Sequence, residues 1–394
     1  MKAKTYGILK KKRWFPEALA SLNDFKLKAG PQIDAADILR NPNISIYCLD
    51  PKNEQVIFVE TPPGLNLTDA AFIYNAQYEN AFRVITIPFA ETMRIAGPLP
   101  DPDQNIIFLY TVGRAGSTLL CKIFEGDADT ISLSEPDIFA CFVPLIKNSA
   151  HKKEGMQALM QACTKILFAG SITRNKKNVL IKPRGICIEI AVDIRKALPR
   201  SKIIFLYRNA QPVIESYIRA FTGGRVFHLL RDLRPSRKLM QFMVKKNQRS
   251  LSCFFPHVTE RHIDLIAKTG LEGALCATWL SIMKTYCALH RNGSDTIAVI
   301  YEDIVSHSRD IITQLFRGCR ISEASVDTAL QALGKDSQED TRLARKLTYK
   351  KKKYLNIINP DHLQMILKTE SEINSADYVV PGTITPGPGQ IKTS

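Results

Sequence analysis

A glycine-rich turn between two apolar segments is the part of this chain best suited to bind a charged ligand. An apolar run from Ile106 to Tyr110 leads through Thr111-Val-Gly-Arg-Ala-Gly-Ser-Thr118 into a segment with helical spacing that reaches Phe124. The backbone amides of such a turn and of the first helical turn carry partial positive charge, which favours an anion such as phosphate or sulfate. An ordinary bend between strand and helix is the alternative interpretation. The candidate anion-binding residues are Gly113, Arg114, Ala115, Gly116, Ser117 and Thr118.

The turn differs from the loop that binds nucleoside triphosphates. That loop places four residues between its first Gly and a Gly-Lys-Ser/Thr sequence. Here only Arg114 and Ala115 separate Gly113 from Gly116, and no Lys precedes Ser117. Arg114 supplies a positive charge from inside the turn instead.

A second apolar run, from Lys202 to Tyr207, ends next to a cation. Arg208 follows this run directly, and the residues from Val213 to Phe221 have helical spacing. Arg208 is therefore predicted at the carboxyl end of a parallel strand, where open α/β sheets bind their ligands. We expect Asn209 to cap the helix and Ser216 to converge with Arg208 on one oxyanion. A surface ion pair and a merely tolerated Ser are the alternative.

Together these residues resemble the sulfotransferase family that uses 3′-phosphoadenosine 5′-phosphosulfate. The resemblance implies that the turn from Thr111 to Thr118 holds the 5′-phosphosulfate, and that Arg208 and Ser216 hold the 3′-phosphate. It extends to Ile297-Ala-Val-Ile-Tyr-Glu-Asp-Ile304, which is similar to a late strand of the family that ends in Tyr-Glu-Asp. The resemblance covers about Asn105 to Asn356. We expect that no metal is required, since positively charged side-chain and backbone groups already face the phosphates.

Two cations are candidates for stabilising the leaving phosphate. The segment from Asn178 to Arg184 is predicted to be a strand that ends in two cations, and the family places a Lys at a comparable strand end. The resemblance thus implies that Lys182 contacts the bridging oxygen and protonates the leaving group. The Arg114 guanidinium is a candidate for neutralising charge on the leaving phosphate. A solvated Lys at the end of a strand is the alternative interpretation.

The general base is harder to identify. Cytosolic members of the family carry a His two residues after the Lys, but Arg184 stands there and cannot accept a proton at neutral pH. The resemblance to a branch that uses a carboxylate implies Glu135, in the segment Ile131-Ser-Leu-Ser-Glu-Pro-Asp137. The alternative is a structural acid before Pro136, at the start of a helix.

Two further positions depart from the family pattern. A late basic loop of the family closes over the 3′-phosphate, and Arg345 with Lys346 are the matching candidates, but Leu347 replaces the expected Gly. Leu119 stands where cytosolic members have a Trp that stacks on adenine. We therefore expect adenine to pack on an aliphatic surface or on another aromatic side chain.

The pattern predicts an α/β protein: a three-layer sandwich with a central parallel sheet, of the P-loop-like sulfotransferase form that the resemblance implies, plus a small N-terminal α+β unit. The N-terminal unit should hold a hairpin from Ile44–Leu49 and Val56–Glu60, then a helix from about Thr68 to Phe82. Trp279 should be buried on a helix. The expected divisions are 1–98 (accessory unit), 103–360 (sulfotransferase-like domain), 361–379 (C-terminal helical segment) and 380–394 (flexible tail).

Composition agrees with this class but does not select it. The chain has 394 residues, with 54 Lys and Arg against 38 Asp and Glu, a formal net charge of +16. Such a charge attracts a nucleotide, a nucleic acid or an anionic membrane alike. The nine Cys include no CxxC pair, which favours reduced thiols over a disulfide framework or a zinc site. No apolar run approaches the roughly 18 residues of a membrane span and no secretory signal is recognisable, so we expect a cytoplasmic protein.

The functional prediction is sulfuryl transfer from 3′-phosphoadenosine 5′-phosphosulfate to a hydroxyl or amine of a small molecule or glycan. A nucleotide kinase or hydrolase of the P-loop type is one alternative. A catalytically inactive protein that binds a nucleotide or nucleic acid is another, although nucleic acid is not the expected partner. Homodimer formation stays open, and the acceptor is set by the shape of the cleft rather than by a motif.

Overall fold

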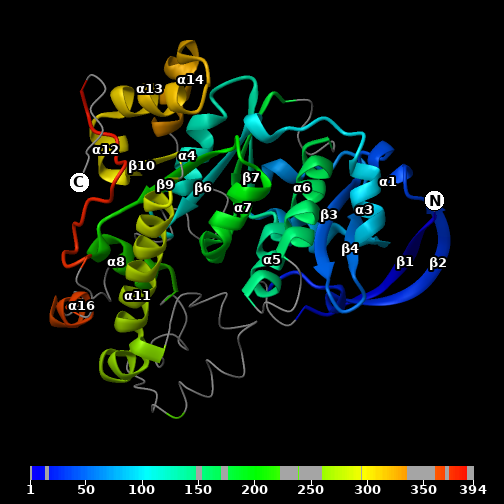
Figure 1. Cartoon of the computed structure of the whole chain (residues 1–394), viewed down its shortest axis with the longest axis horizontal. Helices are drawn as coiled ribbons and strands as arrows, with labels where there is room; N and C mark the ends of the chain where they lie inside the picture. The colour runs from blue at the N-terminus through cyan, green and yellow to red at the C-terminus, as the bar shows by residue number, and fades with distance from the viewer. Residues whose placement is uncertain are drawn as a thin grey trace. The chain divides into compact units, whose positions relative to one another are not determined.

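The computed structural model describes residues 2–13, 17–147, 153–169, 176–221, 238, 260–293, 295–334, 360–368 and 372–387 (Figure 1). The chain forms two compact units. Unit 1 comprises Met1–Phe108 and Asp129–Lys202, and unit 2 comprises Leu109–Ala128 and Ile203–Ser394. The predicted N-terminal boundary, after residue 98, lies within unit 1.

The strands form two five-stranded sheets. One is antiparallel, in the order β2-β1-β5-β4-β3, and the other is parallel, in the order β10-β9-β6-β8-β7. The predicted α/β class with a central parallel sheet is therefore confirmed. The antiparallel strands are β1 (Lys2–Lys11), β2 (Phe25–Asp34), β3 (Ile44–Asp50), β4 (Gln55–Glu60) and β5 (Arg83–Pro88); the parallel strands are β6 (Ile106–Thr111), β7 (Thr130–Ser134), β8 (Asn178–Lys182), β9 (Lys202–Tyr207) and β10 (Thr296–Ile300).

In unit 1, helices from the central part of the sequence cover the antiparallel sheet. Helices α5 and α6 pack against β3, α3 packs against α6, and the rings of Phe108 and Phe139 meet edge to face at 5.3 Å. The predicted hairpin is confirmed, because β3 and β4 pair antiparallel from Ile44 opposite Glu60. The helices of unit 1 are α1 (Asp37–Arg40), α2 (Ile73–Asn80), α3 (Phe89–Ala96), α5 (Asp137–Lys147), α6 (Lys153–Ala169) and α7 (Ala191–Ala197).

The helix predicted from about Thr68 to Phe82 is shorter than expected. Asn66 caps a first turn, since its side chain accepts a hydrogen bond from the Thr68 amide, but this turn is a 3-10 turn that ends at Asp69. Ala70 and Phe72 are extended, and α2 begins only at Ile73. The apolar residues of this segment keep helical spacing in the sequence, although the backbone is not helical between Asp69 and Ile73.

In unit 2, the long helix α11 packs against α8 and α16. It bends at Gly270, whose φ of 64° lies outside the helical region. Trp279 on this helix is buried, as predicted, and the rings of Phe205 and Tyr286 stack at 4.1 Å. Within the described part of unit 2, the helices are α4 (Ser117–Phe124), α8 (Ala210–Phe221), α11 (Glu260–Arg291), α12 (Tyr301–Ser306), α13 (Ser308–Gly318), α14 (Val326–Leu330) and α16 (Pro360–Leu367).

The segment 380–387 differs from the flexible tail expected there. Ala298 of β10 donates a hydrogen bond to the Gly382 carbonyl and accepts one from the Ile384 amide, at 2.9 and 3.0 Å. The hydroxyl groups of Tyr207 and Thr383 lie 2.9 Å apart. Strand β10 lies at the edge of its sheet and offers backbone groups for pairing, so a Pro- and Gly-rich segment becomes ordered against it.

Two features are absent from the described ranges. None of their helices combines the length and the apolar character needed to cross a bilayer. These residues also contain no group of three or more His, Cys, Asp or Glu side chains that could bind a metal ion. Eight of the nine cysteines lie in these ranges, all as buried thiols.

Candidate functional site

The glycine-rich turn joins β6 to α4 with the predicted bounds. Its backbone enters the left-handed region three times, at Gly113 (φ 74°), Arg114 (φ 53°) and Gly116 (φ 87°). Helix α4 starts at Ser117, and its ladder begins with the Leu120 amide, which donates to the Gly116 carbonyl at 3.0 Å. Amides earlier in the helix lie outside that ladder, which is the arrangement that favours an anion.

Two tyrosines pack so closely on the turn that only glycine fits there. A Cβ atom at Gly113 would lie 1.8 Å from the Tyr217 hydroxyl, and one at Gly116 would lie 2.4 Å from the ring of Tyr301. Neither tyrosine is among the predicted site residues. The available signals were positional: Tyr217 adjoins Ser216, and Tyr301 opens the Tyr-Glu-Asp sequence.

The turn is linked to the second predicted anion site by one hydrogen bond. Arg114 Nε donates to Ser216 Oγ at 3.1 Å, across 102 residues of sequence. Ser216 therefore binds the arginine of the turn, and this contact differs from the direct convergence with Arg208 that we expected. The bond joins the turn to α8 within unit 2.

Arg208 directly follows β9 and contacts three residues of unit 2. Its Nε donates to Glu302 Oε1 at 2.9 Å, and its guanidinium lies over the Tyr301 ring, 4.7 Å from the centroid. The Trp279 indole donates to its carbonyl at 2.9 Å. Tyr301 thus contacts both Arg208 and the turn at Gly116.

The cap predicted from Asn209 is wrong. Its Oδ1 is buried and accepts no hydrogen bond among the residues that the structure describes, and α8 starts at Ala210. Leu119 faces the core at 6% exposure, so it offers adenine little surface. The predicted phosphate contacts Arg345 and Lys346 lie outside the described residues.

A second cluster lies in unit 1, where β7 and β8 end. Ser134 pairs with Lys182 in the parallel register, and the Glu135 amide donates to the Lys182 carbonyl at 2.7 Å. Lys182 Nζ lies 3.8 Å from Glu135 Oε1 and 5.6 Å from the centroid of the Phe72 ring. The Lys182 side chain is 7% exposed, so a solvated lysine at the strand end does not describe it.

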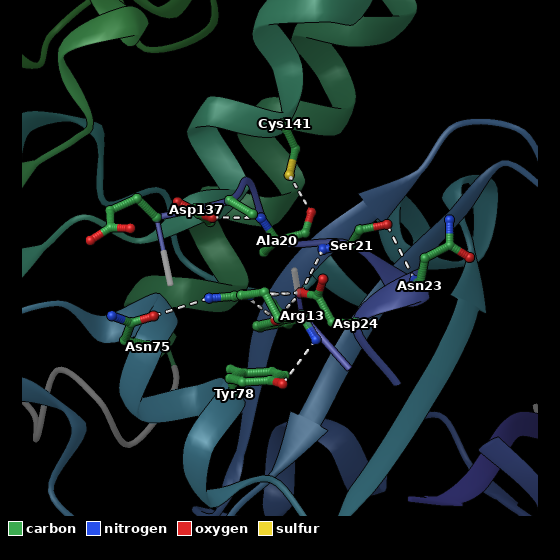
Figure 2. Close-up of polar contacts among 12 residues, drawn as sticks. Arg13, Ala20, Ser21, Asn23, Asp24, Asn75, Tyr78, Asp137 and Cys141 are labelled. Carbon is green, nitrogen blue, oxygen red and sulfur yellow. Dashed lines mark hydrogen bonds and ion pairs between the residues drawn. The ribbon is translucent and has the colours of Figure 1, made fainter. Parts of the chain in front are cut away.

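Arg184, the residue at the position of the missing histidine, is a buried structural cation. It binds Asp137 with two bonds, Nε to Oδ1 at 2.5 Å and a terminal nitrogen to Oδ2 at 2.9 Å. Asp137 also accepts the Ala20 amide at 2.8 Å (Figure 2). Burial raises the pKa of Asp137, and the Arg184 charge opposes that rise. Because Arg184 presents only donors, it cannot be the base.

Glu135 stores backbone strain. Its φ is 54°, a region that a non-glycine residue enters at a cost. We expect Glu135→Gly to be more stable than Glu135→Ala by about 1 kcal/mol in urea unfolding, because both lose the carboxylate and only alanine keeps the strain. At Glu79, in the last turn of α2, the order should reverse, by up to about 0.5 kcal/mol. Equal stabilities of the two Glu135 variants would contradict the left-handed backbone.

Comparison with known proteins finds distant similarities. No protein-family model matches the chain, and no curated protein matches it. A crystal structure of a sulfotransferase from Alicyclobacillus acidocaldarius has 13% identity and a TM-score of 0.31, covering 58% of this chain and 93% of that one. Retinol dehydratase with androsterone and the inactive cofactor PAP has 13% identity and a TM-score of 0.31, covering 78% and 84%. The same enzyme with retinol and PAP has 12% identity and a TM-score of 0.30, covering 80% and 86%. The fold stated above stands on the strand order of this chain itself.

Proposed function

We propose that this chain is a sulfotransferase that uses 3′-phosphoadenosine 5′-phosphosulfate and an acceptor hydroxyl or amine on a small molecule or glycan. The observation that carries the proposal is the hydrogen bond from Arg114 to Ser216, which joins the two predicted phosphate sites in one unit. The shared contact of Tyr301 with Arg208 and with the turn at Gly116 supports it. Two anion sites joined in this way suit a ligand with two separate phosphates.

The residues of unit 2 fit such a donor. Gly113 and Gly116 permit the left-handed backbone that carries the turn into the N-terminus of α4, and a helix N-terminus favours an anion. Glu302 engages Nε of Arg208, which leaves the terminal nitrogens of that guanidinium available to another acceptor. In this proposal the turn residues 113–118 hold the 5′-phosphosulfate, and Arg208 and Ser216 hold the 3′-phosphate, with Arg345 and Lys346 as further contacts. The bound donor would supply the sulfuryl group.

The proton chemistry is assigned to the cluster of unit 1. Glu135 would accept the proton of the acceptor group, because its carboxylate is partly exposed and reachable from solvent. Lys182 would donate a proton, or a hydrogen bond, to the leaving phosphate oxygen. Arg114 would add positive charge on the donor side.

Titration calorimetry with three ligands tests the proposal. We expect 3′-phosphoadenosine 5′-phosphate (the bisphosphate) to bind, and to bind more tightly than ATP with magnesium or an oligonucleotide. Preference for ATP with magnesium would instead favour a kinase or hydrolase. Preference for the oligonucleotide would favour a nucleic-acid-binding protein. If the protein binds the bisphosphate but transfers a sulfuryl group to no acceptor tested, it would instead be an inactive nucleotide-binding protein.

Loss of the proposed contact between Arg208 and the 3′-phosphate should weaken the binding of the bisphosphate. We expect Arg208→Ala to reduce its binding by about 1.5 to 3 kcal/mol, the scale of a hydrogen bond to a charged group. Arg317→Ala is the matched control, since Arg317 is also an arginine of unit 2 paired with a glutamate, Glu323, at 2.8 Å. An unchanged dissociation constant for Arg208→Ala, measured by calorimetry, would refute the assigned role.

A further inference from the structure

Two ion pairs lie side by side where β7 and β8 end. The two strand ends share one pattern, an ionisable residue, a proline and a second ionisable residue: Glu135-Pro136-Asp137 follows β7, and Lys182-Pro183-Arg184 begins with the last residue of β8. The first members form an outer pair, Glu135 with Lys182, at 3.8 Å. The second members form an inner pair, Asp137 with Arg184, at 2.5 Å.

The inner pair is the better bound of the two. Asp137 is fully buried and accepts two bonds from Arg184 and one from the Ala20 amide. Arg184 also donates to the carbonyls of Glu17 and Ala18, at 2.6 and 3.4 Å. Its guanidinium lies 3.8 Å from the centroid of the buried Tyr74 ring. A bidentate pair with these additional partners has one geometry, because each bond constrains the guanidinium plane.

The outer pair has much less to hold it. The Glu135 side chain is 22% exposed, and its contact with Lys182 is longer than a hydrogen bond. Glu135 nevertheless keeps a strained backbone with φ 54°. Such strain persists only where the surrounding structure imposes it. One proline, with its fixed φ, is all that separates each outer residue from its inner neighbour.

We infer that Asp137 and Arg184 are positioning residues that hold Glu135 and Lys182 in register for proton transfer. They act through the backbone of the two proline segments and touch no substrate. Their role in catalysis rests on the proposed function, whereas their effect on the position of Lys182 does not. The inner pair also fastens the segment from Glu17 to Ala20 beside these strand ends, so the N-terminal part of the chain contributes to the same arrangement.

The rate at which acetic anhydride acetylates Lys182, followed by mass spectrometry in the full chain, tests the inference. The double variant Arg184→Met/Asp137→Asn removes both buried charges and keeps an acceptor for the Ala20 amide, so we expect it to fold. Acetylation of Lys182 should then rise by about tenfold or more, because the strand ends open locally. Arg184→Lys keeps the charge without the fork of donors and should give an intermediate rate.

Two controls separate positioning from general loosening. Cys163, buried on α6, should stay unreactive toward N-ethylmaleimide in each variant used. If Cys163 reacts in the double variant, the acetylation rate of Lys182 in Arg184→Lys is used to test the inference instead. The matched variant Arg83→Met/Glu60→Gln removes another ion pair of unit 1, between β5 and β4, and should leave the Lys182 rate unchanged. A rate within about twofold of wild type in a folded inner-pair variant, or an equal rise in the control, would overturn the inference.

Activity gives a separate readout. If the chain transfers sulfuryl groups, the inner-pair variants should lower kcat by about 10- to 100-fold, the scale of a small misplacement of reacting groups. The dissociation constant of the bisphosphate should change much less than kcat, because its proposed contacts other than Lys182 belong to unit 2. An unchanged kcat would overturn the positioning role. Failure of every variant and of the wild type to bind the bisphosphate would refute the proposed function instead, while the acetylation result would still test the inner pair.

Discussion

Gly116→Ala is expected to destabilise the protein by about 2 to 4 kcal/mol and to weaken bisphosphate binding by about tenfold or more. Gly116 has φ 87°, and a Cβ atom there would lie 2.4 Å from two carbons of the Tyr301 ring. The ring also supports Arg208, so the clash displaces the turn, the tyrosine or both. Urea unfolding and calorimetry measure the two effects.

A control and a double variant identify the cause. Gly334, also in unit 2, has an ordinary φ, and a Cβ atom there would meet none of the described residues within 4 Å, so Gly334→Ala should change stability by less than about 0.5 kcal/mol. Adding Tyr301→Ala to Gly116→Ala removes the clash but leaves the strained φ. We expect part of the lost stability to return, a non-additive result. Strictly additive losses would show that the ring is not the obstacle.

Arg13→Met should destabilise the protein by about 3 to 5 kcal/mol. Arg13 is 2% exposed and donates two bonds to Asp24 Oδ2, at 3.2 and 2.9 Å (Figure 2). It also donates to Asn75 at 3.1 Å, and its guanidinium lies 4.5 Å from the centroid of the Tyr78 ring. Removing the arginine leaves Asp24 as a buried carboxylate without its countercharge.

An exposed arginine of the same unit serves as the control. Arg40 lies 3.6 Å from Asp37, and its side chain is 76% exposed, so Arg40→Met should cost less than about 1 kcal/mol. The double variant Arg13→Met/Asp24→Asn should recover part of the loss, since no unpaired charge remains buried. Chemical unfolding of the four proteins measures these differences. A similar loss for Arg13→Met and Arg40→Met would contradict the assigned burial.

Local features of the sequence predicted the elements that carry the candidate site. Strand β6 begins at Ile106, α4 begins at Ser117, and β9 spans Lys202–Tyr207, all as expected. These bounds depend on short apolar runs and on glycines that permit a left-handed backbone, and both act over a few residues. The same local reasoning failed for the helix expected from Thr68, where a break in the backbone leaves the apolar spacing unchanged.

The partners of the charged residues could not be predicted in this way. Ser216 accepts from Arg114 across 102 residues, and Glu302 holds Arg208 across 94. Arg184 was expected as a second cation at a strand end, yet it is buried against Asp137, 47 residues away. Nothing near an arginine in the sequence specifies which distant carboxylate it will meet.

The strand-turn-helix elements, and the residue types that each presents, follow from the amino-acid order, because neighbouring side chains fix the local backbone conformation. How those residues are used depends on tertiary contacts: Tyr217 and Tyr301 close on the two glycines, Arg184 is enclosed, and residues 382–384 bond to Ala298 at the edge strand β10. Burial and charge pairing depend on segments that meet only when the chain folds.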